Sequence, residues 1–382
     1  MKNIFFKYCG TSGFVRSQGE LLQVAAIIGR KLWEPISWAK AMIVFALCIG
    51  HPANAEVYDL PLPGDDVVGA ITTVPARAED TLLDIARRHG MGYEDIVRAN
   101  PNVDTWLPGE GTEVVLPTRF VLPPGPRRGI ILNLAEYRLY YFPEPRDGER
   151  GVVMTYPMSI GRMDWETPLG KTTVIQKVTD PAWYPPASIR EEHAANGDPL
   201  PRIVPAGPKN PLGKHAMRLG LPGYLIHGTN RPAGVGMRVT HGCVRMFPED
   251  IAFLFNQVAV NMPVRIINEP VKLGWDGDML VMEAHRVLDV APPLPEENPE
   301  SVRSQGELLQ VGDNESVEVE NIIPEAPRDR MTYLTEQYVG VTATRAGQLD
   351  WELAEGLLDA ANGIPAPVGR AIKNAATSAA SE

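Results

Sequence analysis

The residues best equipped for chemistry lie between His227 and Arg245, where the sequence is HGTNRPAGVGMRVTHGCVR. This stretch of the 382-residue chain contains two histidines, one cysteine and four glycines. A free thiol has a pKa of about 8.5 and is mostly protonated at neutral pH, so a nucleophilic cysteine needs a nearby base or positive charge. His227, at the end of the strand expected for YLIH, is the candidate base, and His241 precedes Cys243 by two residues. The pattern predicts nucleophilic catalysis by Cys243.

Two neighbours of the cysteine suit a site for acyl transfer. Gly242 allows the backbone to turn tightly before Cys243, so that amide N–H groups can face a developing oxyanion. Arg245 supplies a fixed charge that can hold a substrate carboxylate through two parallel hydrogen bonds.

Three plainer interpretations compete with this one. His227 can be a strand-end histidine whose hydrogen bonds the fold satisfies. Cys243 can be an inert core thiol, although its His, Gly and Arg neighbours are a poor setting for one. A zinc site can be drawn from His215, His227, His241 and Cys243. Against zinc, no pair has the usual ligand spacing, and no acidic residue lies between His227 and Arg245.

Residues 1–55 have the features of an export signal. The uncharged run AMIVFALCIG at residues 41–50 follows basic residues that include Lys40, and the sequence HPANAE after it predicts cleavage after Ala55. The run is too short for a stop-transfer helix. A short buried helix and an uncleaved anchor are the alternative interpretations.

Cleavage would remove two of the three cysteines, Cys9 and Cys48, and leave Cys243 alone in the exported protein. A lipoprotein signal is disfavoured, because the bulky Leu47 precedes Cys48 where a small residue is needed. No disulfide can then form within the mature chain, although exported cysteines are normally paired.

The decapeptide VRSQGELLQV occurs at residues 15–24 and again at 302–311. Two copies do not make a repeat array, and we interpret them as an inserted DNA element or a misjudged start site. The second copy lies in an acidic tail. From Ala291 onward there are 16 acidic and 6 basic residues, which gives −10 of the net charge of −11. The remainder is close to neutral and lacks the basic surface that nucleic-acid binding requires.

Residues 72–117 are expected to form a small α+β domain. The sequence predicts a strand at TTV, a helix capped by Asp80 and stopped at Gly90, a helix in YEDIVRANP and a strand in GTEVVLP. This order resembles a LysM domain, the module that binds the glycan of peptidoglycan and chitin. Departures from the LysM pattern at Glu79 and Thr72 bear on glycan affinity, and a purely structural domain is the alternative. The matching residues are Thr81-Leu82, Ile85-Ala86, Ile96, Ala99-Asn100-Pro101 and Val114 to Pro117.

After a linker at 118–129, residues 130–268 have a mainly β pattern, and the 35 glycines and 36 prolines of the chain exclude a helix bundle. One clear helix is expected from Pro248, where the acids that follow suit its dipole. The segment Asp180–Gly213 has little periodicity and is typical of a functional loop or lid. The expected strands are IILNL, YRLYYF, VVMTYPMSI, TTVIQKV, YLIH and PVRII.

Residues 269–382 form a C-terminal extension of mixed character. Its acidic, proline-rich part at about 291–321 predicts disorder. Leucines that recur every four residues, at Leu349, Leu353 and Leu357, predict one helix over about 347–361.

The motif around the cysteine resembles the L,D-transpeptidase family with a YkuD-type catalytic domain. The family signature is a His, a spacer, then Ser or Thr followed by His-Gly-Cys. The resemblance continues through SIGRMDWETPLG, VPAGPKNPLG and IHGTN and covers roughly residues 70–285. The arrangement is similar to that of a Gram-negative subgroup whose members anchor an outer-membrane lipoprotein or cross-link two diaminopimelates. Here the signature is His227, twelve residues, Thr240, His241, Gly242 and Cys243.

The resemblance implies a mainly β-sandwich or barrel-like catalytic domain and a thioester mechanism. Cys243 would attack the diaminopimelate carbonyl of a tetrapeptide stem and expel D-alanine. His227 would take the thiol proton, with the carbonyl of Gly228 orienting its ring. No cofactor is implied, because thiol acyl exchange needs none. Oxyanion donation and substrate binding would fall to the backbone of Gly242 and to Thr240, His241 and Arg245.

The implied partners are peptidoglycan stem peptides and glycan, with an outer-membrane lipoprotein as one candidate acceptor, and the expected location is the periplasm. The acceptor is a lipoprotein lysine, another diaminopimelate or water. Water would make the enzyme an L,D-carboxypeptidase or a lipoprotein-detaching amidase. A catalytically silent peptidoglycan-binding protein is the alternative from another class, and the intact His227 and Cys243 disfavour it.

Overall fold

A computed structural model describes residues 56–145, 148–163, 165–288 and 328–372, all within one compact unit. The expected export signal, both copies of the decapeptide and the acidic segment at about 291–321 lie outside the described residues. Within the described ranges, no helix has the length and apolar character needed to cross a membrane.

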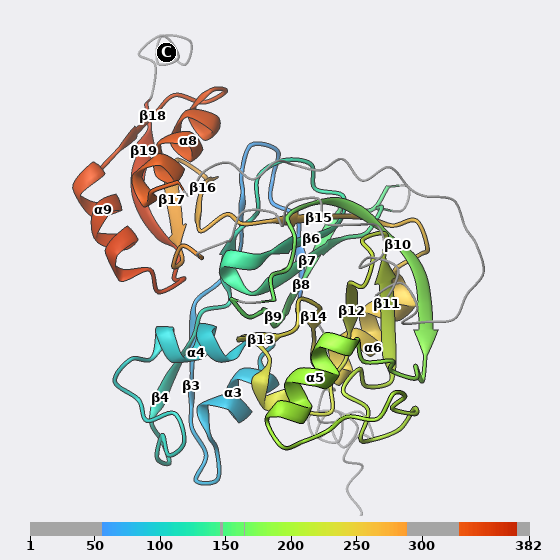
Figure 1. Ribbon diagram of the computed structural model, residues 1–382. Helices are drawn as coiled ribbons and strands as arrows, with labels where there is room; N and C mark the ends of the chain where they lie inside the picture. Colours follow the sequence, from blue (N-terminus) through green and yellow to red (C-terminus); the bar gives the residue numbers. More distant parts are fainter. Residues whose placement is uncertain (1–55, 146–147, 164, 289–327, 373–382) are drawn as a thin grey trace, which may run out of the picture. The chain divides into compact units, whose positions relative to one another are not determined.

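A nine-stranded sheet forms the centre of the catalytic region (Figure 1). Its spatial order is β1-β8-β7-β6-β15-β10-β11-β12-β14, and the pairs β6–β15 and β12–β14 are parallel while the others are antiparallel. All six strands expected from the sequence are present, because β-branched and aromatic residues fill a sheet buried on both faces, as in β6 and β7. The bounds are β1 Glu56–Asp59, β6 Gly129–Asn133, β7 Arg138–Phe142, β8 Val152–Pro157, β10 Gly170–Thr179, β11 His215–Leu219, β12 Leu225–His227, β14 Val244–Arg245 and β15 Pro263–Ile267.

The helix expected at Pro248 is α6, Pro248–Gln257, with proline in its first turn and two acids behind it. Its buried residues Ile251 and Leu254 join the main core with side chains of β6, β7, β11 and β15. A second pair of strands, β9 (Ile160–Gly161) and β13 (Arg238–Thr240), runs parallel beside the sheet.

The catalytic region contains a further helix that the sequence did not predict. Helix α5, Ala187–Ala195, lies in the segment 180–213, which we expected to be a loop. Its sequence ASIREEHAA buries one residue, Ile189, and therefore lacks the apolar stripe that reveals most helices. The side chain of Asn210, fully buried, donates to the carbonyl oxygens of Pro181, Val204 and Pro205 and so ties the base of this segment together.

The N-terminal unit has the expected order of strand, helix, helix and strand. These elements are β3 (Thr72–Pro75), α3 (Leu82–Arg88), α4 (Tyr93–Ala99) and β4 (Glu113–Leu116), and β3 pairs with β4 in antiparallel register. The side chain of Asn100 bonds both Ile96 at the end of α4 and Val115 in β4, which fixes the second helix on the strand.

Two expectations for this part of the chain were wrong. The cap of α3 is Thr81, which shares a capping box with Asp84, and not Asp80. Asp80 instead forms a paired contact of 2.6 Å with Arg88, which holds its pKa at about 2. The expected linker 118–129 contains β5, Arg119–Val121, which pairs with β2, Val67–Gly69.

The C-terminal extension has its own four-stranded sheet in the order β16-β17-β19-β18, with α8 and α9 (Figure 1). The expected helix is α9, which begins after its cap Asp350 because Gly347–Leu349 form a strand. Helix α8 was missed, since it buries only Tyr333 and Leu334 and gives a weak apolar pattern. The bounds are β16 Val271–Asp276, β17 Met279–Ala284, α8 Arg330–Thr342, β18 Gly347–Leu349, α9 Trp351–Ala360 and β19 Ala366–Ala371.

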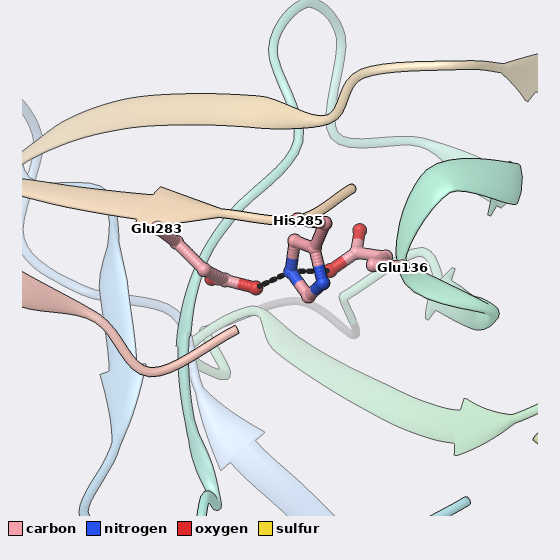
Figure 2. A group of neighbouring side chains, drawn as sticks. All are labelled: Glu136, Glu283 and His285. Carbon is pink, nitrogen blue, oxygen red and sulfur yellow. Dashed lines mark hydrogen bonds and ion pairs between the residues drawn. The ribbon is translucent and has the colours of Figure 1, made fainter. Parts of the chain in front are cut away.

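Four buried side chains, Glu136, Lys272, Glu283 and His285, connect this sheet to the catalytic core and are called the paired cluster below. Figure 2 shows His285 between the two carboxylates, with its Nε2 at 2.7 Å from Glu283 and 3.9 Å from Glu136. Lys272 Nζ lies 2.6 Å from Glu136 and 3.0 Å from Glu283. Opposite charges in mutual contact offset the cost of removing them from water.

Candidate active site

Strand pairing brings the two ends of the chemical motif together. Strands β12 and β14 are parallel neighbours, with Ile226 opposite Val244 and His227 opposite Arg245. Cys243 immediately precedes β14 and is therefore level with Leu225, two register positions from His227 on the neighbouring strand, although 15 residues separate Cys243 and His227 in the sequence. Positions two apart along a strand share a face of the sheet, so both side chains can face the same site.

Cys243 is partly exposed and packs against the buried apolar pair Leu212 and Leu225. Its Sγ lies 3.6 Å from the carbonyl oxygen of Gly223, a weak contact for a thiol donor. The apolar surroundings raise the pKa of the thiol to about 11, while the charge of Arg245 acts in the opposite direction. The resting nucleophile is therefore a protonated thiol that needs a base.

His227 is buried, and its Nδ1 lies 2.6 Å from the carbonyl oxygen of Gly228. A carbonyl can only accept, so Nδ1–H donates, which leaves Nε2 as the nitrogen that can take a proton. Burial and then the charge of Arg245 lower the pKa of the imidazole to about 3. The ring is therefore neutral at physiological pH, in the state that a general base requires.

The backbone of Arg245 pairs with His227 on one side and with Ser159 on the other. Its N–H donates to Ser159 O at 3.0 Å, and Ser159 N–H donates to Arg245 O at 2.8 Å. Its Nε is buried and has no hydrogen-bond partner among the described residues. Burial and the nearby Arg231 lower the pKa of the guanidinium. A desolvated cation with an unused donor is suited to an anionic ligand or transition state.

The backbone between His241 and Val244 is shaped by one glycine and two threonines. Gly242 has a φ of +92°, and a Cβ there would lie 2.9 Å from the ring of Tyr224, so only glycine fits. Thr167 Oγ1 donates to Gly242 O at 2.8 Å, and Thr240 Oγ1 donates to Cys243 O at 2.6 Å. Because both carbonyls are engaged, the turn is fixed in one orientation.

His241 faces the segment that contains α5. Its Nε2 lies 3.1 Å from Glu192 of that helix, and its ring packs edge-on against Trp165 with centroids 5.1 Å apart. Glu192 also accepts from Arg162 at 2.6 Å. Burial lowers the pKa of His241, and Glu192 opposes the shift.

Sequence reasoning missed Arg162, Thr167 and Glu192. The first two stand in the conspicuous run SIGRMDWETPLG, where polar residues flanking a tight turn were the available signal. Glu192 gave no signal beyond its place in the expected lid.

The four residues of the zinc alternative are not gathered. His215 stacks on Phe255 with ring centroids 4.8 Å apart. It is the first residue of β11, which β12 separates from β14 in the sheet. Across the described ranges, the single group of three or more His, Cys, Asp or Glu with converging ligand atoms is Glu136, Glu283 and His285 (Figure 2). The ammonium of Lys272 already contacts both of these carboxylates, so the donor set is occupied by a cation of the protein itself.

The chain is similar in sequence to several named proteins. Residues 127–266 match the model of the YkuD L,D-transpeptidase catalytic domain. The chain is 40% identical over 260 residues to "Probable L,D-transpeptidase YbiS" of Escherichia coli K12, which covers 67% of this chain and 81% of that protein. It is 34% identical over 330 residues to "Probable L,D-transpeptidase YcfS" of the same organism, with 85% and 92% covered. A third relative, "Probable L,D-transpeptidase ErfK/SrfK" of Salmonella typhimurium LT2, is 40% identical over 253 residues, with 65% and 79% covered.

Proposed function

The chain belongs to the L,D-transpeptidase family, an acyltransferase family that acts on peptidoglycan, and we propose that it works through a thioester on Cys243. The observation that carries the proposal is the parallel pairing of β12 with β14, which places Cys243 two register positions along the neighbouring strand from a neutral histidine whose Nδ1 is fixed by a carbonyl. A protonated thiol next to an oriented neutral imidazole is the arrangement that base-assisted nucleophilic attack requires.

In the acylation step, His227 Nε2 accepts the proton of the Cys243 thiol as the sulfur attacks the carbonyl carbon of diaminopimelate in a tetrapeptide stem. The C–S bond forms, the C–N bond to the terminal D-alanine breaks, and the imidazolium returns its proton to the leaving amine. The N–H groups of Gly242 and Cys243 donate to the oxyanion, since the strained turn at Gly242 frees them from regular pairing.

Three cationic or polar side chains flank the reaction centre. Arg245 stabilises negative charge near the sulfur, because its guanidinium is desolvated and has an unused donor. His241 contacts Glu192 of α5, and the Thr240 hydroxyl donates to the backbone carbonyl oxygen of Cys243.

In the second step, an acceptor amine attacks the thioester while His227 takes its proton, and the thiol is regenerated. We propose an amine acceptor, either a lysine of an outer-membrane lipoprotein or a second diaminopimelate. The apolar packing of Leu212 and Leu225 against Cys243 supports this, because it limits water at the thioester. Hydrolysis, as an L,D-carboxypeptidase or a lipoprotein-detaching amidase, is the second candidate.

We also propose that the strand–helix–helix–strand unit is a LysM domain that binds glycan. An exposed pair, Trp106 at 61% and Leu107 at 80% exposure, stands on the loop between α4 and β4. Asp104 accepts from both of their backbone N–H groups and fixes the loop. An aromatic ring held in solvent is suited to stack on a sugar face. Trp106→Ala should weaken retention on insoluble peptidoglycan, and equal retention of both proteins would contradict the assignment.

We place the reaction in the periplasm, reached through the export signal at residues 1–55. Fractionation of cells that produce a tagged chain, together with sequencing of the mature N-terminus, tests the location. A full-length protein confined to the cytoplasm would contradict it.

The decisive experiment compares wild type with Cys243→Ala. Both proteins are incubated with purified muropeptides and with a lysine-bearing acceptor peptide, and the products are identified by mass spectrometry. Wild type should form a covalent adduct at Cys243 and joined products, and the variant neither. Released D-alanine without a joined product would favour hydrolysis, and equal product from both proteins would refute the mechanism.

A further inference from the structure

One carboxylate of the protein lies beside the nucleophile motif and is held by two cationic or hydrogen-bonding side chains. Glu192 Oε1 accepts from Arg162 at 2.6 Å, and Glu192 Oε2 lies 3.1 Å from His241 Nε2. Glu192 belongs to α5, whereas Arg162 directly follows β9 and His241 directly follows β13. The contact therefore joins two parts of the catalytic region that are far apart in the sequence.

The backbone of Arg162 and the ring of His241 are held close to the sequence motif that contains the nucleophile. The backbone N–H of Arg162 donates to Thr240 O at 3.0 Å, immediately after the pairing of Gly161 with Thr240 in β9 and β13. His241 precedes Cys243 by two residues and is packed edge-on against Trp165. The backbone of Arg162 and the ring of His241 therefore have contacts outside α5.

Glu192 is ionised at neutral pH, because hydrogen bonds from Arg162 and His241 lower the pKa of its carboxyl. The other charged or titratable neighbour of His241 on this helix is His193, whose ring centroid lies 6.3 Å away. An arginine and a histidine that share one carboxylate form a recognition site for carboxylates in general.

Helix α5 is weakly anchored. Ile189 is its one buried residue, and the side chains of Arg162 and Glu192 remain 32% and 28% exposed. Half-exposed ion pairs contribute little to stability. A contact that adds little to folding, in a segment with little buried apolar surface, can be exchanged for a ligand at low cost.

We propose that Arg162 and His241 form a carboxylate subsite for the donor stem peptide, and that Glu192 is an internal occupant which the substrate carboxylate displaces. The proposal rests on the proposed function and extends it to substrate recognition. A tetrapeptide stem that ends in diaminopimelate and D-alanine offers two carboxylates near the scissile bond, the terminal carboxylate of D-alanine and the side-chain carboxylate of diaminopimelate. Displacement of Glu192 would release α5 at the moment the donor binds.

Binding is measured in the Cys243→Ala chain, so that turnover does not interfere. The probes are a synthetic tetrapeptide stem, the same stem with its terminal carboxylate amidated, and the same stem with the diaminopimelate side-chain carboxylate amidated. Glu192→Gln should tighten binding of the unmodified stem about three- to tenfold, since a competing charge is removed while the shape is kept. Arg162→Gln should weaken it by a similar factor. Glu191→Gln, an exposed neighbour on the same helix, serves as the matched control and should leave affinity unchanged.

The amidated stems identify the carboxylate. The stem that lacks the recognised carboxylate should bind the Glu192→Gln and parent chains equally, whereas the other stem should keep the difference. If Glu192→Gln changes affinity for all three stems by the same factor, or for none, the subsite does not exist. Failure of the proposed function would look different, because it would appear as no adduct on Cys243 in wild type while the carboxylate preference in binding persists.

Discussion

The paired cluster and the active site are both groups of buried titratable residues, and they differ in how completely their polar atoms are used. In the paired cluster, the Lys272 ammonium contacts Glu136 and Glu283, His285 bonds Glu283, and the backbone of Val121 donates to Glu283 at 2.7 Å. In the active site, Arg245 Nε is buried without a partner among the described residues, and Cys243 Sγ makes a 3.6 Å contact.

This difference separates a structural role from a chemical one. Charges that satisfy each other hold two parts of a chain together but have no capacity left for a ligand. Buried polar groups without a complete set of partners lower the stability of the resting protein. A substrate or transition state that supplies the missing partner gains that free energy on binding. Changes in the two regions should therefore affect different observables.

The largest expected effect is on turnover, from removal of the nucleophile. Cys243→Ala should lower release of D-alanine on the order of 10³-fold or more, because the covalent route is lost. Its free energy of unfolding should change by about 1 kcal/mol or less, since the side chain is partly exposed and forms no strong hydrogen bond. A severely destabilised Cys243→Ala would show that the thiol has a structural role.

The next effect is on stability. Lys272→Met should reduce the free energy of unfolding by about 3–5 kcal/mol, because two buried carboxylates lose their cation. The activity of the molecules that remain folded should be unchanged. Denaturant titration measures the first, and turnover at low temperature, normalised to folded protein, measures the second.

Lys209→Met, at an exposed position, is the matched control and should shift the unfolding free energy by about 0.5 kcal/mol or less. Equal stability of the Lys272→Met chain and this control would mean that the paired cluster does not stabilise the fold.

The pH dependence of stability should distinguish the two regions. The pKa of His227 is about 3 in the folded chain against 6.5 for an unperturbed histidine, so the unfolded chain binds more protons between these values. The free energy of unfolding therefore has its full His227 contribution above pH 6.5. It falls by about 1.4 kcal/mol per pH unit as the pH drops toward 3. His227→Gln should lack this slope.

One carboxylate of the paired cluster, that of Glu283, should respond at lower pH. Burial pushes the pKa of Glu283 upward, but Lys272 and His285 outweigh it and hold the pKa at about 2. The contribution of this carboxylate is present above the unfolded value of 4.5 and is lost as the pH falls through about 2. Unfolding curves of wild type and His227→Gln that run parallel from pH 6.5 to pH 4.5 would contradict the separation.

The smallest effect is expected from one hydroxyl beneath the nucleophile turn. Thr167 Oγ1 donates to Gly242 O and accepts from Gly161 N–H at 3.1 Å, and the side chain is buried. Thr167→Val should cost about 1–2 kcal/mol of stability and lower turnover up to about tenfold, as the oxyanion donors lose their alignment. Thermal unfolding and D-alanine release report the two changes. Thr335→Val on the exposed face of α8 is the control. A similar loss of turnover in this control would show that Thr167 does not act by aligning the oxyanion donors.

The strands and α6 could be predicted because their signals are local. The aromatic and β-branched run of β7 and the proline and acids that open α6 specify these elements within a few residues. Helix α5 has no such signal, since its sequence is polar and it buries Ile189 alone. The cap of α3 could not be chosen between Asp80 and Thr81 from the sequence, because the choice depends on the ion pair of Asp80 with Arg88.

The same division applies to the site. Cys243, His227 and Arg245 could be selected from residue type and spacing within one stretch of chain. Thr167 and Glu192 could not, because their contacts with Gly242 and His241 span 75 and 49 residues and arise only after the sheet and α5 are assembled. The resemblance to a family implied a role for the carbonyl of Gly228, and the 2.6 Å contact with His227 Nδ1 gives that role a geometry.

The pairing of β12 with β14 also determines which segments of the chain can tolerate inserted residues. His227 lies opposite Arg245 through backbone contacts alone, and Arg245 is clamped to Ser159 on its other side. An insertion between the two strands, in the exposed part around Arg231 and Ala233, alters only the loop and leaves the register intact. Insertion of one residue between Cys243 and Arg245 shifts the nucleophile by one position relative to Arg245 and turns its side chain toward the other face of the sheet. Natural and engineered length variation should therefore concentrate in the first segment and be absent from the second.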